Sequence, residues 1–220
     1  MAGTTTEYLE EFSGIEIEVI DTECFLIRNA FNVNEQQTLF EYIQANDKTP
    51  WNTIKPAMVP SPKTLIFGEN GEPCLNYEFG QKSIINNMVD KANAVMIKNE
   101  IKSRSNNFKS CKSISMATIK YQSPDGKFPP HIDHCKNSFV YLTSLGCTAN
   151  FMVKGLNMEI KRDFKFNSGD LLVFDASTEA KILLGVSGID TSITAESKQI
   201  GKLFPVLENH RYAVQCRLHF

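Results

Sequence analysis

The first part of the chain alternates short apolar runs with one helical pattern. Residues 15–20 alternate apolar and acidic side chains, which predicts a strand with one face in water. Residues 25–27 form a second apolar run, and a helix should follow. Asn34 suits the N-cap of that helix and Gln37 the capping-box partner three residues later. Its buried face would consist of four apolar side chains, namely Leu39, Phe40, Tyr42 and Ile43.

The middle of the chain contains a proline-rich stretch, a strand and a second helix. Residues 48–62 are predicted to form a loop, and residues 63–67 a strand. Ser83 could cap a helix with apolar residues at helical spacing, which are Ile85, Met88, Val89, Ala92, Val95 and Met96. Residues 98–112 are basic and poor in apolar side chains, which indicates a solvated loop.

From Ile114 onward the pattern changes to short strands separated by turn residues. The predicted strands are Met116–Tyr121, Phe139–Leu145, Asn150–Val153, Leu171–Phe174, Lys181–Val186 and His210–Phe220. Helices followed by regularly spaced strands favour an α+β chain, with a β-sandwich or barrel that helices cover on one side. We expect a loose tail over residues 1–14 and a single domain over 15–220, with its strand-rich core at about 114–220.

Composition and charge exclude several classes of protein. The chain has 220 residues and a net charge of −2, so no global charge favours nucleic acid or an acidic membrane. It contains no apolar run of the length that a membrane span needs, and residues 1–10 lack the features of a signal peptide. Its six cysteines are scattered without a Cys-x-x-Cys pair, which favours reduced thiols in the cytoplasm or nucleus. We expect a monomer without a membrane partner.

Two motifs suggest chemistry. His131 and Asp133 are two residues apart, and in an extended segment both side chains point to one face and can converge on a metal. Arg211 and Arg217 share the same parity in a predicted strand, where two buried arginines would be costly without anions. This combination is typical of a non-haem iron site beside a pocket for a dicarboxylate. Such an iron site needs two histidines and one carboxylate, but no histidine lies between His134 and His210.

The order of the motifs resembles that of a known family. Four elements follow one another as in the iron(II)/2-oxoglutarate dioxygenases, namely Tyr121-x4-Gly126-x4-His131-x-Asp133, Thr143-Ser144-Leu145-Gly146, Gly169-Asp170-Leu171-Leu172-Val173-Phe174 and Arg211-x5-Arg217. Upstream elements resemble the nucleotide-recognition region of the AlkB group, namely Thr49-Pro50-Trp51, Pro62-Lys63, Phe67-Gly68 and Tyr77. The resemblance covers about residues 24–220.

The resemblance implies a fold, cofactors and site residues. The fold would be a double-stranded β-helix, or jelly roll, with supporting N-terminal helices. His131 and Asp133 would bind Fe(II), and Arg211 would form a salt bridge with the distal carboxylate of 2-oxoglutarate. Tyr121 would donate a hydrogen bond to this cosubstrate, and Arg217 would lie close to it and to the iron-binding aspartate. A substrate base would contact Trp51, Lys63 and Tyr77.

Three positions depart from the family pattern. Leu184 occupies the position of the distal histidine ligand, and a leucine offers no lone pair to a metal. Ile119 and Ala213 occupy the positions of two asparagines that help to hold the cosubstrate. Asp175 or Glu179 could replace the missing ligand only if the fold brought its carboxylate to the metal, because each lies several residues away from the ligand position in the sequence.

Three functions therefore remain open. The first is oxidative demethylation or hydroxylation of alkylated nucleic-acid bases with Fe(II) and 2-oxoglutarate. The second is a degenerate member that retains the fold as a binding module for nucleic acid, a protein or a carboxylate metabolite. The third is a hydroxylase of a protein side chain or a small molecule. Leu184 puts the activity of the first in doubt, and the nearly neutral net charge favours the second and third functions over strong DNA binding.

Overall fold

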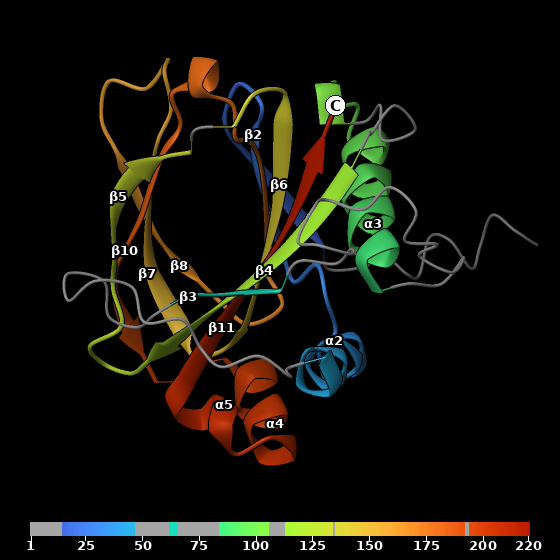
Figure 1. Ribbon diagram of the computed structural model, residues 1–220, viewed down its shortest axis with the longest axis vertical. Coiled ribbons are helices and arrows are strands. Elements are labelled where there is room, and N and C mark those ends of the chain that lie inside the picture. Colours follow the sequence, from blue (N-terminus) through green and yellow to red (C-terminus); the bar gives the residue numbers. More distant parts are fainter. Residues whose placement is uncertain (1–14, 47–61, 66–83, 106–112, 134, 192–193) are drawn as a thin grey trace, which may run out of the picture.

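Two antiparallel sheets packed face to face form the centre of the computed structural model (Figure 1). The structure describes residues 15–46, 62–65, 84–105, 113–133, 135–191 and 194–220. The larger sheet has the strand order β1 (Glu16–Asp21), β2 (Cys24–Arg28), β9 (Leu171–Asp175), β6 (Ser138–Gly146), β11 (His210–His219), β4 (Ser113–Gln122) and β3 (Pro62–Leu65). The smaller sheet has the order β5 (Phe128–Ile132), β10 (Leu183–Asp190), β7 (Thr148–Lys154) and β8 (Arg162–Phe166). This arrangement confirms the predicted jelly roll.

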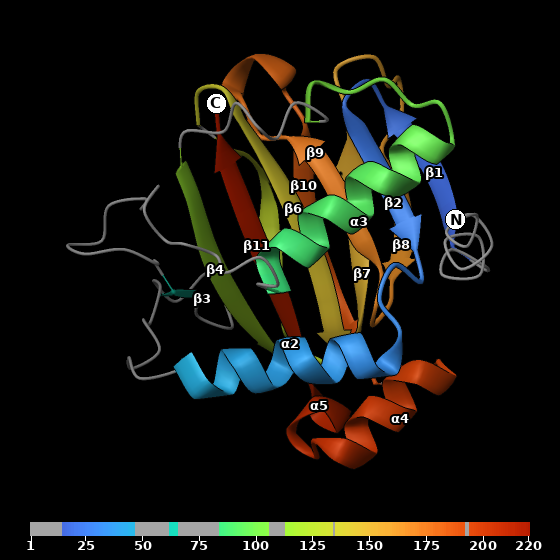
Figure 2. The ribbon, with the colours of Figure 1, turned by 90° about the vertical axis from the view of Figure 1, so that its right-hand side faces the viewer.

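The helices support the larger sheet from outside. Helices α2 (Val33–Asn46) and α3 (Ile84–Lys98) lie across its outer face, as Figure 2 shows. Helices α4 (Ala195–Leu203) and α5 (Val206–Asn209) pack together at one end, below α2 in the same view. A single 3-10 turn, η3 (Thr178–Ala180), precedes β10. None of the helices in the described residues is long and apolar enough to cross a membrane.

Alternate side chains of β11 point into two different hydrophobic cores, one on each face of the larger sheet. Tyr212, Val214 and Cys216 face the helices and belong to the core between the helices and the larger sheet. Ala213 faces the other way, into the core between the two sheets. Because alternate residues of a strand point to opposite faces, Arg211 also faces the space between the sheets. The larger sheet is therefore buried on both sides, and its inner face carries the candidate site.

The structure confirms most predicted elements and adds others. All six strands predicted beyond Ile114 are present, although the one predicted at Lys181 begins at Leu183. Lys181 has a left-handed backbone with φ of 51°, which ends the preceding 3-10 turn and delays the strand. The sequence analysis missed β5, β8, α4 and α5. Strand β5 contains Pro129 and Pro130, and it tolerates them because it lies at the edge of its sheet.

The N-cap of helix α2 is Asn32, so the prediction of Asn34 was wrong. The Oδ1 atom of Asn32 accepts a hydrogen bond of 3.0 Å from the Glu35 amide, and Glu35 Oε2 accepts one of 2.8 Å from the Asn32 amide. This reciprocal pair is a capping box formed two residues earlier than expected. Gln37 instead donates from its side chain to Glu41 within the helix.

The cap at Asn32 predicts that alanine substitution of Asn32 and of Asn34 will affect the free energy of unfolding differently. We expect Asn32→Ala to lower the free energy of unfolding by about 1 kcal/mol, because the Glu35 amide loses its acceptor. The matched variant Asn34→Ala should change it by less than about 0.5 kcal/mol, since alanine favours the helix interior. Urea unfolding of the two variants measures both values. An equal or larger loss for Asn34→Ala would contradict the assigned cap.

Candidate functional site

A cavity of about 240 Å³ lies between the two sheets. It is lined by four of the predicted site residues, namely Tyr121, His131, Asp133 and Arg211, and also by Leu184. Four of these residues lie in strands β4, β5, β10 and β11, and Asp133 directly follows β5. The fold thus brings together side chains that are up to 90 positions apart, from Tyr121 to Arg211.

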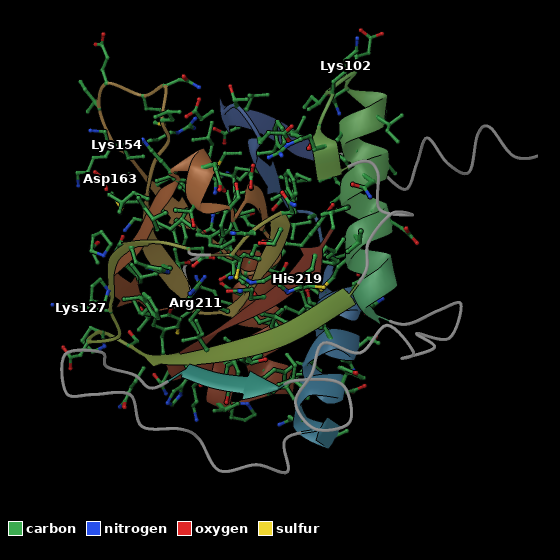
Figure 3. All side chains as sticks on the ribbon, turned by 45° about the horizontal axis from the view of Figure 1, so that its top comes forward. Lys102, Lys127, Lys154, Asp163, Arg211 and His219 are labelled. Atoms are coloured by element: carbon green, nitrogen blue, oxygen red, sulfur yellow. The ribbon has the colours of Figure 1, made fainter. Side chains whose placement is uncertain are left out.

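Arg211 is the most unusual side chain in the cavity. It is fully buried, and Figure 3 shows it in the interior while the labelled lysines Lys102, Lys127 and Lys154 lie at the periphery. Its Nε donates a hydrogen bond of 2.8 Å to Ser144 Oγ. Both Nη1 and Nη2 are buried and have no hydrogen-bond partner among the described residues. A buried guanidinium with two free donors is costly unless an anion binds to it.

Aromatic rings hold the Arg211 guanidinium in place. Its central carbon lies 5.0 Å from the ring centroid of Tyr121 and 5.3 Å from that of Phe166, which are cation–π distances. Burial lowers the pKa of Arg211, and the nearby Tyr121 partly opposes this shift. Burial raises the pKa of Tyr121 to about 12, although Arg211 acts in the opposite direction. The Tyr121 phenol is therefore neutral near pH 7 and retains its proton for donation.

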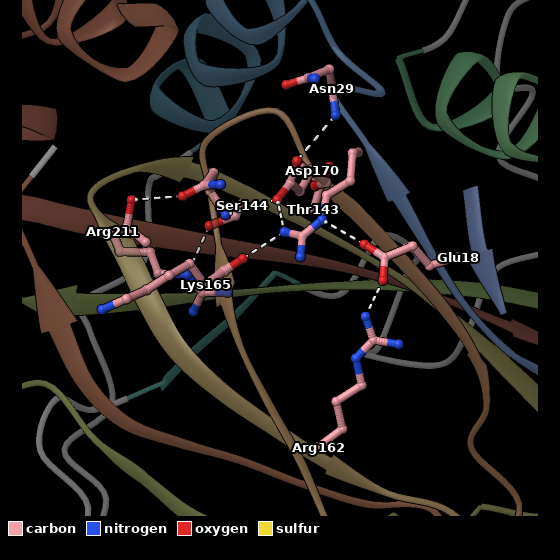
Figure 4. A network of polar contacts seen from close by, with 11 residues as sticks. Glu18, Asn29, Thr143, Ser144, Arg162, Lys165, Asp170 and Arg211 are labelled. Atoms are coloured by element: carbon pink, nitrogen blue, oxygen red, sulfur yellow. Dashed lines mark hydrogen bonds and ion pairs between the residues drawn. The ribbon is translucent and has the colours of Figure 1, made fainter. Parts of the chain in front are cut away.

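A polar network fixes Ser144, the partner of Arg211 (Figure 4). The Gly169 amide donates to the Ser144 carbonyl at 2.8 Å, and Thr143 Oγ1 donates to the Asp170 carbonyl at 3.0 Å. The buried Asp170 carboxylate accepts from Arg28 Nη1 at 2.8 Å and from two backbone amides, those of Asn29 and Asn167. The Gly169-Asp170 motif therefore has a structural role, because it orients the strand that holds Arg211.

His131 and Asp133 lie next to each other at the cavity. His131 Nε2 lies 3.5 Å from Asp133 Oδ1, and Arg217 Nη2 lies 2.7 Å from Asp133 Oδ2. His131 Nδ1 is 2.9 Å from the Pro129 carbonyl oxygen, which can only accept, so Nδ1 donates. This hydrogen bond turns Nε2 toward Asp133, and metal-binding histidines commonly donate from their other ring nitrogen in the same way.

Burial and neighbouring groups shift the pKa values of both His131 and Asp133. Burial disfavours the protonated form of His131, but hydrogen bonds to Asp133 and to the Pro129 carbonyl outweigh it, and the pKa of His131 is raised. Burial also disfavours the charged form of Asp133, yet His131 and Arg217 together hold the pKa of Asp133 below its usual value. Asp133 is therefore an anion whose two oxygens are already engaged by protein groups.

Leu184 faces His131 directly. The two residues are paired across the antiparallel strands β10 and β5, and both line the cavity. Directly opposed residues in antiparallel strands place their side chains on the same face of the sheet. The buried Leu184 side chain therefore lies on the same face of the sheet as His131, and it can offer no lone pair to a metal there.

Neither Asp175, Glu179 nor His210 lines the cavity of His131 and Asp133. Asp175 accepts a hydrogen bond of 2.8 Å from the Ser177 amide and forms an ion pair with Arg104. Asp175 and Glu179 line a different cavity. His210 Nδ1 is bonded to the Val206 carbonyl oxygen at 3.0 Å. Among the described residues, no group of three histidine, cysteine, aspartate or glutamate side chains could hold a metal ion.

Some site residues were missed and others lie outside the described part of the chain. Gln215 also lines the cavity, and the strand parity that it shares with Arg211 could have revealed it. Ser144 belongs to a motif of the family resemblance, but its hydrogen bond to Arg211, 67 residues away, was not predicted. Trp51 and Tyr77 are outside the described residues, and of Lys63 only the strand backbone in β3 is described.

Solved structures with the same architecture identify the fold. OsALKBH1 superposes with a TM-score of 0.61 at 17% identity, covering 93% of this chain and 100% of that chain. A Pseudomonas putida prolyl-4-hydroxylase gives 0.53 at 10% identity, covering 90% and 92%. The chain has the fold of the 2-oxoglutarate-dependent iron oxygenases. A Trichoplax adhaerens prolyl hydroxylase, in complex with a hypoxia inducible factor peptide, gives 0.54 at 13% identity, covering 90% and 84%. No protein-family model and no curated protein matches the sequence.

The oxygenase fold implies two cofactors, 2-oxoglutarate and Fe(II), and the residues of the cavity fit the first better than the second. A carboxylate fits, because Arg211 offers two buried donors without protein partners. Iron does not fit in the same way. The described residues provide His131 and Asp133, but the facing position holds the apolar Leu184. The residues of the cavity thus suit a carboxylate better than they suit iron.

Proposed function

We propose that the chain is a carboxylate-binding protein built on the oxygenase fold, and that it does not sustain iron-dependent oxidation. The free Nη1 and Nη2 atoms of Arg211, buried in the cavity that Leu184 also lines, are the observation that carries this proposal. The side chains of Arg211, Tyr121 and Ser144 would act as one binding unit. Arg211 would bind the carboxylate, Tyr121 would donate to it, and Ser144 would orient the guanidinium.

Arg217 and Asp133 have a different role in this proposal. Their ion pair of 2.7 Å is partly buried, with side-chain exposures of 13% and 16%. It lies beside His131 and neutralises the carboxylate that an oxygenase would offer to iron. The metal-binding pair is thus retained as structure, in agreement with a degenerate member of the family.

An active oxygenase is the alternative, and one observation favours it. The Pro129 carbonyl holds His131 in the orientation that a metal ligand needs, although the third ligand is missing. With Fe(II), 2-oxoglutarate and an alkylated nucleic-acid base as substrate, Trp51, Lys63 and Tyr77 would be the base contacts, as the AlkB resemblance implies. The hydroxylation of a protein or small molecule would use the same two ligands.

Titration of the metal-free protein in EDTA tests the proposal. We expect binding of at least one acid from a panel of 2-oxoglutarate, succinate and hexanoate to the wild type, and of none to Arg211→Met. If no carboxylate binds without metal, the proposed function is wrong. If 2-oxoglutarate binds only after Fe(II) is added, the active oxygenase is the better account.

A further inference from the structure

The wall of the cavity is apolar over most of its length. Arg211 lies at the buried end, and His131, with 39% of its side chain exposed, marks the open end. The wall around them is formed largely by apolar side chains, among them Ile119, Leu142, Phe151, Phe174, Val186 and Ala213. Ile119 and Ala213 face each other across β4 and β11, two residues from Tyr121 and Arg211 respectively. A ligand leaving the guanidinium therefore enters an apolar passage.

Among the residues that the structure describes, the open end offers no free cation to a second carboxylate. His131 and Arg217 are both engaged with Asp133, at 3.5 and 2.7 Å. Arg217 Nη1 is buried without a partner among the described residues, but Arg217 is not one of the residues that line the cavity. Leu184 adds an apolar surface opposite His131. A second carboxylate would thus meet the Asp133 anion and a leucine, which is unfavourable, and the amide of Gln215, which also lines the cavity, carries no charge to offset this.

We propose that the ligand of this cavity is a monocarboxylate with a short apolar body, and that a dicarboxylate of equal length binds less tightly. The inference rests on the proposed carboxylate site at Arg211. The volume of about 240 Å³ lies below the range of roughly 300–1,000 Å³ that is typical of sites for drug-sized ligands, so the body must be small. A short aliphatic chain or a single ring meets this condition. Burial of that body against the apolar wall would supply affinity that a second charge cannot.

Hexanoate and adipate form a matched pair for the test. They have equal chain length and differ only in the second carboxylate. In calorimetric titrations of the metal-free full chain in EDTA, we expect hexanoate to bind about tenfold more tightly than adipate, or better. Phenylacetate should bind with an affinity close to that of hexanoate. Hexylamine is the charge control and should not bind, because its ammonium would face Arg211.

Variants separate the two charged ends of the cavity. Asp133→Asn removes the repulsive anion at similar shape, so the ratio of the hexanoate and adipate affinities should fall towards one. Ile119→Asn places a polar group on the apolar wall and should weaken hexanoate more than adipate. Arg211→Met should abolish binding of both acids. Thermal unfolding of each variant checks that it is folded before its affinities are compared.

The outcomes distinguish the inference from the function on which it rests. If adipate or 2-oxoglutarate binds the wild type as tightly as hexanoate, the preference for a monocarboxylate is wrong while the carboxylate site stands. If none of the acids binds, the proposed function itself is overturned. Tight hexanoate binding that survives Arg211→Met would also contradict the inference, because the acid would then bind through its apolar body elsewhere.

Discussion

Replacement of Arg211 by methionine should raise the stability of the ligand-free protein and remove its affinity for carboxylates. A buried cation without an anion costs several kcal/mol, and methionine fills similar space without that cost. The variant loses the hydrogen bond to Ser144 and the contacts with two aromatic rings. We therefore expect a net gain of about 1–3 kcal/mol in the free energy of unfolding, measured by urea unfolding without added carboxylate.

The same substitution should weaken carboxylate binding by at least about 100-fold. Each charge-assisted hydrogen bond contributes about 1.5–3 kcal/mol, and Arg211 has two free Nη donors. Arg104→Met is the matched control. Arg104 is 61% exposed and pairs with Asp175 outside this cavity, so its loss should lower stability slightly and leave carboxylate affinity unchanged. A destabilised Arg211→Met variant that still binds carboxylates would show that the guanidinium has only a structural role.

Leu184→His should restore a metal site with three protein ligands. His131 and Asp133 are already adjacent, and the new imidazole would face His131 across β10 and β5. Substitution of residues that contact the metal ligands, but not the metal itself, changes metal affinity about 10–100-fold. A regained residue that binds the metal directly should therefore increase the affinity by at least about 100-fold. Titration with Co(II), followed by its visible absorption, measures the affinity of the wild type and the variant.

The stability of the Leu184 variants supplies a second readout. Without metal, Leu184→His should lose about 1–3 kcal/mol, because it buries a polar ring in an apolar wall. Leu184→Asn should lose a similar amount, since it is also polar. Co(II) at about 100 times the dissociation constant should return about 2.7 kcal/mol to the histidine variant and nothing to the asparagine variant. Equal responses of the two variants to Co(II) would show that position 184 does not face the metal.

The inner face of the larger sheet was predictable because periodicity determines it. The parity of Arg211, Ala213 and Arg217 along a single strand places all three on the face opposite to Val214. The family resemblance, and not periodicity, assigned Leu184 to the position of the distal ligand, and its pairing with His131 across β10 and β5 is a finding of the structure. Hydrophobic alternation thus predicted a β-sandwich or barrel and the inward face of β11, while the family resemblance supplied the jelly roll and the roles of the site residues.

Contacts between distant segments could not be predicted from periodicity. Ser144 holds Arg211 only because the turn at Gly169 and Asp170 packs beside it. Strand β5 was missed because Pro129 and Pro130 normally interrupt strands, and only its position at the sheet edge explains their presence. The cap at Asn32 was missed because the Asn34 side chain offered an equally suitable cap in the sequence.

Turnover of 2-oxoglutarate tests the central claim, which is that the chain retained an anion site and lost oxidation. The measurement is succinate formation in air with Fe(II) and ascorbate, for the wild type, for Leu184→His and for a control without protein. The account predicts that the wild type does not exceed the control at any Fe(II) concentration. Steady, iron-dependent succinate formation by the wild type would contradict it, because His131 and Asp133 would then suffice for an active oxygenase.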